Sequence, residues 1–259
     1  MTAAPHPITG LRRSLREVAG IVRSLRIYHG SPGRRRRMAK LYAEFVGPGD
    51  LVFDIGAHVG DRIDAFRGLG ARVVALEPQP AAFRWLKLRY GWDRRVTLMQ
   101  AAAGETSGTI ELYVNIANPT VSTASQGFID ASQGAPGWEG QHWDETISVN
   151  AITLDALIET HGVPAFVKID VEGFELAVLN GLSRPVRALS FEFTTIQRDV
   201  AEACLSRLAQ LGDYRFNVAL GESQRLEFAE LVEGTRIAAF VAGLPHGANS
   251  GDIYARLPA

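Results

Sequence analysis

The chain has 259 residues, a net charge of −1 and a hydrophobic content of 46%, which is typical of a globular protein with one or at most two domains. A single cysteine, Cys204, excludes an intrachain disulfide and is compatible with a reducing cytosol, so a cytoplasmic location is expected. Apolar runs are shorter than the roughly 18 residues of a membrane span, and the N-terminus lacks the apolar core of a secretory signal.

Residues 1–40 form a basic segment with ten Lys/Arg residues and one acidic residue, Glu17. Apolar residues recur there at roughly helical spacing between arginines, and they are Leu11, Leu15, Val18, Ile21, Val22, Leu25 and Ile27. The pattern predicts a basic helical extension that packs on its own domain or on a second subunit, or contacts an anionic membrane surface through 11–37. The run Arg34 to Arg37 is interpreted as a solvated loop and helix start. Nucleic-acid binding is not expected, because no aromatic residues are interleaved with these charges.

From residue 38 the pattern alternates between strands and helices, which predicts an open, mostly parallel sheet with helices on both faces. The expected strands are 51–55, 72–77, 96–102, 109–115, 147–150, 166–170, 189–193, 214–220 and 252–257. The expected helices are 38–46, 60–69, 80–90, 153–161, 174–181, 199–211 and 229–242.

One long stretch, 116–146, loses periodicity and is rich in small polar residues, yet it keeps Trp138 and Trp143. Thirty such residues exceed a simple connection, so we expect a lid on the acceptor side of a binding site. The two tryptophans and His142 are predicted to lie at the mouth of the pocket.

The segment from Asp54 to Gly60 follows a buried strand, and the next strand ends at Glu77. Strand, glycine turn, helix, strand and acidic residue is the order of a nucleotide-type cofactor site. His58 stands where a dinucleotide fingerprint has its second glycine, and no Gly-Lys-Ser/Thr triplet is present. A ligand with a ribose and an ammonium group, such as S-adenosylmethionine, therefore fits better than a dinucleotide. An ordinary strand-to-helix turn around Gly56 is the alternative.

A second informative segment runs over 166–181, where an apolar strand ends in Asp170 and turns into a helix. Because open α/β sheets bind ligands at the carboxyl ends of their strands, four carboxylates should share one rim, and they are Asp54, Glu77, Asp170 and Glu192. Lys168 either pairs with one of them or reaches solvent. Clustered carboxylates can hold Mg²⁺, but the pattern offers no third ligand, so no metal is expected. Glu172 and Glu175 are interpreted as favouring a helix N-terminus.

Three blocks of this sequence resemble the FkbM family of S-adenosylmethionine-dependent methyltransferases. They are 47–60, then 74–78 with 101–113, then 154–157 with 168–175 and 179–181, and together they span roughly 45–195. The resemblance implies a seven-stranded class I methyltransferase fold over 41–259, with its last strand antiparallel. It also implies O-methylation of a hydroxyl on a sugar, a glycolipid or a secondary metabolite. His58 departs from the family's usual asparagine.

Carried over to this chain, the resemblance assigns ten residues to the cofactor, and they are Asp54, Gly56, Ala57, His58, Gly60, Glu77, Pro78, Gln100, Ala101 and Asp170. Asp54 would orient the ammonium group, Glu77 would bind the ribose, and Gln100 and Ala101 would contact adenine. An acceptor alcohol must also release its proton. The candidates for receiving it are Asp170, Glu192 and His142.

Two other functions remain open at the level of sequence. One is a nucleotide-binding oxidoreductase that uses the same turn and Glu77, against which the missing middle glycine counts. The other is a non-catalytic protein of the membrane surface that keeps a degenerate cofactor fold, for which the basic extension is the only support.

Overall fold

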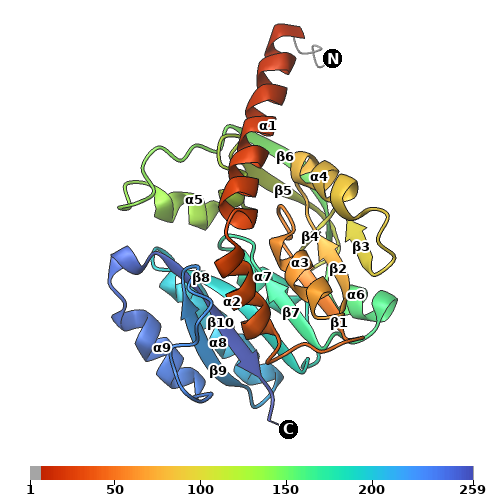
Figure 1. The fold of residues 1–259 in the computed structure, drawn as a ribbon. Helices are drawn as coiled ribbons and strands as arrows, with labels where there is room; N and C mark the ends of the chain where they lie inside the picture. The colour runs from red at the N-terminus through yellow and green to blue at the C-terminus, as the bar shows by residue number, and fades with distance from the viewer. Residues whose placement is uncertain (1–6, 259) are drawn as a thin grey trace.

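The computed structural model describes residues 7–258, with side chains from residue 13 onwards (Figure 1). Residues 1–6 of the predicted extension, and the side chains of Leu11 and Arg12, lie outside the described residues. The centre of the fold is a seven-stranded sheet in the order β3-β2-β1-β7-β8-β10-β9. Its strands are β3 (Val96–Met99), β2 (Arg72–Leu76), β1 (Leu51–Ile55), β7 (Phe166–Ile169), β8 (Ala188–Thr194), β10 (Ser250–Arg256) and β9 (Arg215–Leu220).

Strand direction in this sheet follows the prediction. β10 is antiparallel to both of its neighbours, β8 and β9, whereas the pairs among β3, β2, β1, β7 and β8 are parallel. The expected class I methyltransferase fold, mostly parallel with an antiparallel last strand, is therefore confirmed. Since parallel strands place their carboxyl ends at one edge, the residues that follow β1, β2, β7 and β8 meet there.

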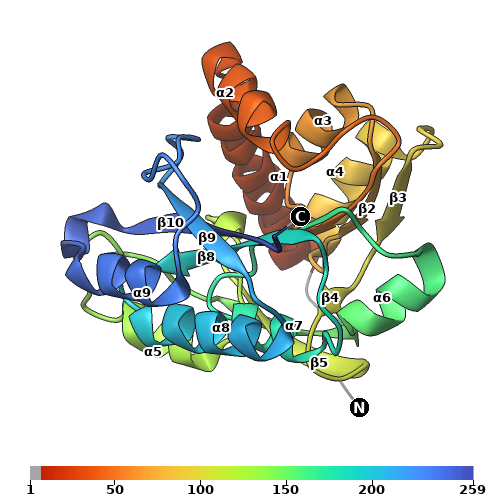
Figure 2. The ribbon, with the colours of Figure 1, turned by 90° about the horizontal axis from the view of Figure 1, so that it is seen from below.

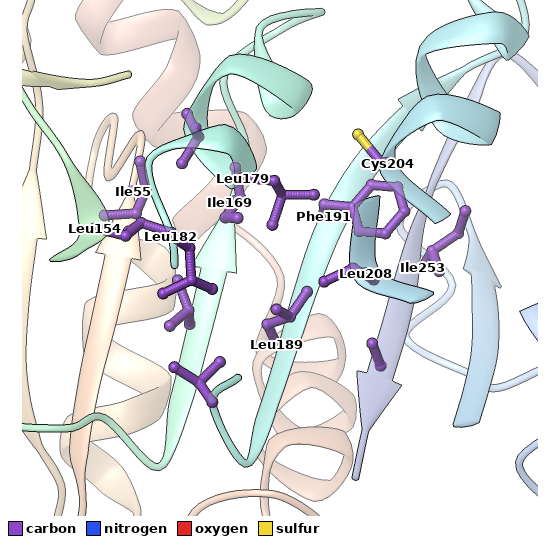
Figure 3. Packing of buried hydrophobic residues seen from close by; sticks show 14 of the residues in the cluster. Ile55, Leu154, Ile169, Leu179, Leu182, Leu189, Phe191, Cys204, Leu208 and Ile253 are labelled. Carbon is purple, nitrogen blue, oxygen red and sulfur yellow. The ribbon is translucent and has the colours of Figure 1, made fainter. Parts of the chain in front are cut away.

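Helices cover both faces of the sheet (Figure 2). One face packs against α6 (Leu154–His161), α7 (Glu175–Asn180), α8 (Arg198–Leu211) and α9 (Gly234–Gly243). The other packs against α2 (Pro32–Tyr42), α3 (Asp61–Gly68) and α4 (Pro80–Tyr90). Within β1 the side chains alternate between the two layers, because Phe53 and Ile55 face α6 while Val52 faces α2 and α3. Cys204 is fully buried in the first layer beside Phe191 and Leu208 (Figure 3), so it is a core residue.

A second, three-stranded sheet has the order β4-β6-β5 and consists of β4 (Ala102–Ala103), β6 (Glu145–Ile152) and β5 (Gly108–Val114). The chain between β5 and β6 contains η1 (Pro119–Val121) and α5 (Gln126–Ser132). A second 3-10 turn, η2 (His246–Ala248), precedes β10. The stretch 116–146 was predicted to be aperiodic, but it contains a short helix and the start of a strand. The expected single strand 96–102 is divided between β3 and β4.

The basic segment at the N-terminus forms two helices, α1 (Pro7–His29) and α2. The run Arg34 to Arg37 lies inside α2 and not in a loop, because Ser31 caps the helix by accepting a hydrogen bond from the Arg34 amide (3.3 Å) and Pro32 opens it. In α1, Ile21 is buried against Val59 and Ala82.

The opposite face of α1 is exposed, with Leu15 at 62% and Val18 at 60% of their surface. The helix therefore packs on its own fold along one side only. Within the described residues, no helix combines the length and apolarity that crossing a membrane requires.

Candidate active site

A cavity of about 1160 Å³, including its open mouth, lies at the carboxyl edge of the parallel strands. Residues at the ends of β1, β2 and β7 and just after them line it, together with Glu192 of β8 and residues from β4, β10, α1 and the chain after β9. Nine of the twelve predicted site residues line this cavity, and they are Asp54, Gly56, Ala57, His58, Glu77, Pro78, Ala101, Asp170 and Glu192. The other three, Gly60, Gln100 and His142, do not.

The turn after β1 brings three strands together. The amides of Gly56 and Ala57 both donate to the Leu76 carbonyl at the end of β2 (3.0 and 2.9 Å). On the other side, a Cβ atom on Gly56 would lie 1.9 Å from the Asp170 carbonyl oxygen that follows β7, and Gly56 has a φ of +83°. Only glycine fits a left-handed conformation with a backbone so close. This packing aligns Asp54 and Asp170 at the floor of the cavity.

Gly60 has a different role from the one predicted, because it does not line the cavity. It precedes α3 with a φ of +84°, and its carbonyl accepts a hydrogen bond from the Tyr90 hydroxyl (2.7 Å). A Cβ atom there would lie 2.6 Å from the Tyr90 ring. We therefore interpret Gly60 as the residue that seats α3 against α4.

Asp54 is a buried carboxylate without a partner. It is 2% exposed, it lines the cavity, and its Oδ2 has no hydrogen-bond partner among the described residues. Burial raises its pKa to about 7, in spite of the nearby guanidinium of Arg62. A cation placed in the cavity would supply the missing partner, so the ammonium group expected at Asp54 fits this position.

Glu77 is held in place by backbone amides. It is 2% exposed, and its two oxygens accept hydrogen bonds from the amides of Gln79 and His58, each at 2.8 Å. Burial raises its pKa to about 7, while the two amides act in the opposite direction. Each oxygen keeps a second lone pair that can accept from a ribose hydroxyl. The residues therefore fit the ribose end of S-adenosylmethionine.

Replacing Glu77 by alanine is expected to weaken cofactor binding by about 1–3 kcal/mol, because the ribose and the two amides lose a charged acceptor. Calorimetry with S-adenosylhomocysteine measures the change. Glu77→Gln keeps one oxygen acceptor and should lose less affinity than Glu77→Ala. If Glu77→Ala bound S-adenosylhomocysteine with unchanged affinity, Glu77 would have no part in binding the cofactor.

The wall between Glu77 and β4 consists of small and apolar side chains. Ala101, Ala102, Ala103 and Leu112 of β5 all line the cavity there. Gln100 is exposed and does not line it. The sequence interpretation extended the strand through this position, whereas β3 ends at Met99 and the chain turns before entering β4.

The acidic end of the cavity contains a cluster of three carboxylates, Asp170, Glu172 and Glu192. One oxygen from each lies within 4.8 Å of the others. Burial acts to raise the pKa of Asp170, but the charges of Lys168 and Arg62 hold it below its ordinary value. Burial, and then the charge of Asp170, raises the pKa of both glutamates. The sequence interpretation assigned Glu172 to a helix start, so the third carboxylate was missed.

Lys168 explains how this cluster is anchored. The side chain is fully buried, and its Nζ donates to Asp252 of β10 (2.7 Å) and lies 3.2 Å from Asp170. Of the two alternatives left open by the sequence, pairing with a rim carboxylate is therefore confirmed. The partner Asp252 was not predicted, because it lies 84 residues further along the chain.

The N-terminal helices also contribute to the site. Tyr28 of α1 lines the cavity and packs edge-to-face on His58, with ring centroids 5.8 Å apart. Burial lowers the pKa of His58 to about 4, so the ring is neutral. Arg34 of α2 is buried and pairs with Asp61 (2.7 Å) and with Glu222 (2.6 Å) after β9. Nothing in the local sequence around Tyr28 indicated a position in the cofactor cavity.

The stretch 116–146 reaches the cavity through small residues and not through its tryptophans. Thr120, Ser122 and Ala124 line it. Trp138 and Trp143 instead pack on Phe128 of α5, with ring centroids 5.1 and 6.3 Å away. Neither lines the cavity, so their predicted position at its mouth was wrong.

His142 lies outside the site as the structure has it. It is exposed and does not line the cavity. The prediction rested on its place in a polar loop beside two tryptophans. Trp138 is buried and Trp143 is partly buried in the cluster around Phe128, whereas His142 between them is exposed.

Residues 54–218 match the family described as methyltransferase FkbM domain. The hexuronic acid methyltransferase AglP of Haloferax volcanii is 26% identical to this chain over 171 residues. The matched region is 65% of this chain and 65% of that protein, so the chain spans just under two thirds of this relative's length.

Two solved structures of methyltransferases align with most of this chain. The O-methyltransferase from Bacillus cereus in complex with S-adenosylhomocysteine is 13% identical, with a TM-score of 0.47, over 92% of this chain and 90% of that chain. Precorrin-6y C5,15-methyltransferase from Geobacter metallireducens is 16% identical, with a TM-score of 0.45, over 85% of this chain and 86% of that chain.

Proposed function

Because this chain belongs to the FkbM family of S-adenosylmethionine-dependent methyltransferases, we propose that it methylates a hydroxyl oxygen of a sugar or of a sugar-bearing lipid. Family membership removes the oxidoreductase alternative. A sugar acceptor is supported by the relative named as a hexuronic acid methyltransferase. A secondary metabolite that bears a hydroxyl is the third class of acceptor implied by the resemblance.

The acidic cluster of Asp170, Glu172 and Glu192 is the observation that supports a hydroxyl, and not a carboxylate, as the methyl acceptor. A uronic acid offers both hydroxyls and a carboxylate, and either oxygen type could accept a methyl group. Three carboxylates within 4.8 Å of one another can receive the proton that an alcohol must release, whereas a carboxylate acceptor has no proton to release. The proton acceptors at this end of the cavity therefore favour formation of an ether over formation of an ester.

Bound at Asp54, Glu77 and the alanine wall, S-adenosylmethionine supplies a methyl group already activated by its sulfonium. The protein must position the acceptor oxygen and accept its proton. Asp170 is engaged by Lys168 at 3.2 Å, which reduces its affinity for a proton. Glu192 has a buried Oε2 without a hydrogen-bond partner among the described residues. We assign the role of general base to Glu192 and an orienting role to Asp170.

A methyl-transfer assay with labelled cofactor tests the reaction. The acceptors are uronic acid glycosides and a matched series in which the carboxylate is replaced by a hydroxymethyl group. Label that is transferred to both series and resists mild alkali is the expected result, because ethers survive alkali and methyl esters do not. Label that is released by alkali, and absent from the second series, would show that the carboxylate is the acceptor.

Replacing Glu192 by glutamine is expected to lower turnover by about 10²–10⁴-fold, because the acceptor proton loses its base. Binding of S-adenosylhomocysteine should stay close to that of the wild type, since Asp54 and Glu77 remain. Thermal unfolding should not move to lower temperature, because Oε2 has no hydrogen bond to lose. If Glu192→Gln retained its turnover, a group other than Glu192 would have to accept the proton of the acceptor hydroxyl.

We also propose that α1 rests on an anionic membrane surface, which would bring the cavity close to a lipid-linked acceptor. Leu15, Val18 and Val22 form an exposed apolar stripe on one side of α1. Arg23 and Arg26 are exposed on the same helix. In Figure 1 the N-terminal part of α1 extends beyond the rest of the fold. An apolar stripe flanked by arginines suits the boundary between lipid headgroups and acyl chains. Such a contact would be peripheral and on the cytoplasmic side.

Replacing Leu15 and Val18 together by serine is expected to weaken binding to vesicles at least about tenfold, because two apolar side chains no longer enter the bilayer. Sedimentation with phosphatidylcholine vesicles, with and without phosphatidylglycerol, measures the effect. Leu88 of α4 is 78% exposed and lies elsewhere, so Leu88→Ser is the matched control and should bind as the wild type does. Wild-type protein that ignores phosphatidylglycerol vesicles would contradict the proposal.

A further inference from the structure

The acidic cluster is built by two neighbouring strands and the turn between β7 and α7. β7 and β8 pair in parallel with Ile169 opposite Phe191, so the next residues, Asp170 and Glu192, lie side by side at the carboxyl edge. Glu172 reaches the same point from the turn. The three carboxylates come from separate elements, and their oxygens converge within 4.8 Å on the wall of the cavity.

The positive charge near the cluster does not balance it. Lys168 is closer to Asp252 (2.7 Å) than to Asp170 (3.2 Å), so its charge is already shared. Arg62 pairs with Asp61 at 2.6 Å and lies 3.9 Å from Asp170. In the part of the chain that the structure describes, no Lys, Arg or His nitrogen is within 4 Å of Glu172 or Glu192 carboxylate oxygens.

Glu172 is an independent sign of a missing partner. Its side chain is 7% exposed, lines the cavity, and has no hydrogen bond or ion pair among residues 13–258. The backbone holds it there, because the Thr123 hydroxyl donates to the Glu172 carbonyl (2.6 Å). Glu192 likewise keeps a buried Oε2 without a partner. Burying a carboxylate is costly unless a cation or a hydrogen bond compensates for it.

We propose that Asp170, Glu172 and Glu192 bind a divalent cation that prefers oxygen ligands, such as Mg²⁺ or Mn²⁺. Ion-to-oxygen distances of about 2.1 Å place ligand oxygens about 3 Å apart when adjacent and about 4.2 Å apart when opposite. A small closure of the cluster reaches these values. One oxygen from each carboxylate suffices, which leaves the second oxygen of Glu192 for the acceptor proton.

The cation gives the acceptor a place to bind. With three protein ligands, an octahedral ion keeps positions for water or for hydroxyl oxygens of the acceptor. A hydroxyl bound to the ion loses its proton more easily. This second half of the inference rests on the proposed O-methylation, whereas cation binding itself rests only on the cluster.

Titration of the full chain with Mn²⁺, followed through the electron paramagnetic resonance signal of free Mn²⁺, tests the site. We expect one ion to bind, Mg²⁺ to compete for it, and Glu172→Gln to weaken binding at least about tenfold. Glu175 is a matched control, because it is 2% exposed and close by but outside the cluster. Glu175→Gln should keep Mn²⁺ affinity within about threefold of the wild type, since it tests the loss of a nearby charge without the loss of a ligand.

Circular dichroism melting of both variants and binding of S-adenosylhomocysteine separate the possible failures. A folded wild type that binds S-adenosylhomocysteine but not Mn²⁺ overturns the cation site and leaves the proposed function standing. Equal Mn²⁺ affinity in the wild type and Glu172→Gln also overturns it, and so does an equal loss in both variants. If Mn²⁺ binds but methyl transfer survives chelation, the claim that the cation binds the acceptor hydroxyl is refuted. If Mn²⁺ binds but no methyl group is transferred to sugars, the proposed function fails and the cation site stands.

Discussion

Gly56→Ala is expected to abolish binding of S-adenosylhomocysteine and to lower the free energy of unfolding by about 2–5 kcal/mol. The added Cβ would lie 1.9 Å from the Asp170 carbonyl oxygen, and Gly56 holds a φ of +83°. The clash is with a backbone atom, so no side chain can rotate away to relieve it. The turn must therefore move away from β7, and the His58 amide that holds Glu77 would move with it. Calorimetry and denaturant unfolding measure the two effects.

Gly68→Ala is the matched control for this prediction. Gly68 belongs to the last turn of α3, and a Cβ atom there meets nothing within 4 Å. Alanine should be neutral, or should stabilise the helix by about 0.5–1 kcal/mol, because glycine is the poorer helix former. If Gly56→Ala bound S-adenosylhomocysteine as tightly as Gly68→Ala does, the turn after β1 would have no part in the cofactor site.

Lys168→Met is expected to lower the free energy of unfolding by about 3–5 kcal/mol, the usual cost of leaving a buried charge without its partner. Lys168 is fully buried, and Asp252 and Asp170 would both lose its ammonium group. Denaturant unfolding measures the loss. Arg215 offers a control on the surface, where its pair with Glu233 is exposed to solvent. Arg215→Met should change stability far less, because water screens the exposed pair.

A double-mutant cycle identifies the cause of that loss. If the cost comes from the unpaired carboxylate, Lys168→Met combined with Asp252→Asn should be less destabilised than the sum of the two single variants. Strictly additive effects would mean that Lys168 stabilises the sheet through packing of its apolar stem and not through its charge.

The parts of the fold that the sequence predicted correctly are those with local signals. β1 and α4 begin and end at the predicted residues, because apolar runs and a proline at the helix start are read within a few positions. The cofactor end of the site followed for the same reason, since Asp54, Gly56 and Glu77 lie within one strand–helix–strand unit. The start of α2 was also encoded locally, by Ser31 and Pro32, but the arginine run after them was interpreted as a solvated loop and helix start, and it lies wholly within α2.

The residues that were missed depend on contacts between distant segments. Tyr28 enters the cavity because α1 packs across α4, and Asp252 enters the Lys168 pair because β10 lies beside β8. Glu172 was missed because an acidic residue before a helix has a sufficient local explanation. The tryptophans of 116–146 were placed at the mouth because composition does not indicate that they would pack on Phe128. Site assignments away from the strand ends required the tertiary structure.

β10 follows β9 in the chain but lies between β8 and β9 in the sheet. Both β8 and β9 are therefore synthesised before the strand that joins them, and each leaves an edge of unpaired amides and carbonyls. The ammonium group of Lys168 also cannot pair with Asp252 until 84 further residues have been synthesised. A chain arrested on the ribosome before β10 emerges should be open, prone to aggregation and dependent on chaperones. The order of translation thus determines when Lys168, which holds Asp170 in place, can first gain Asp252 as its second partner.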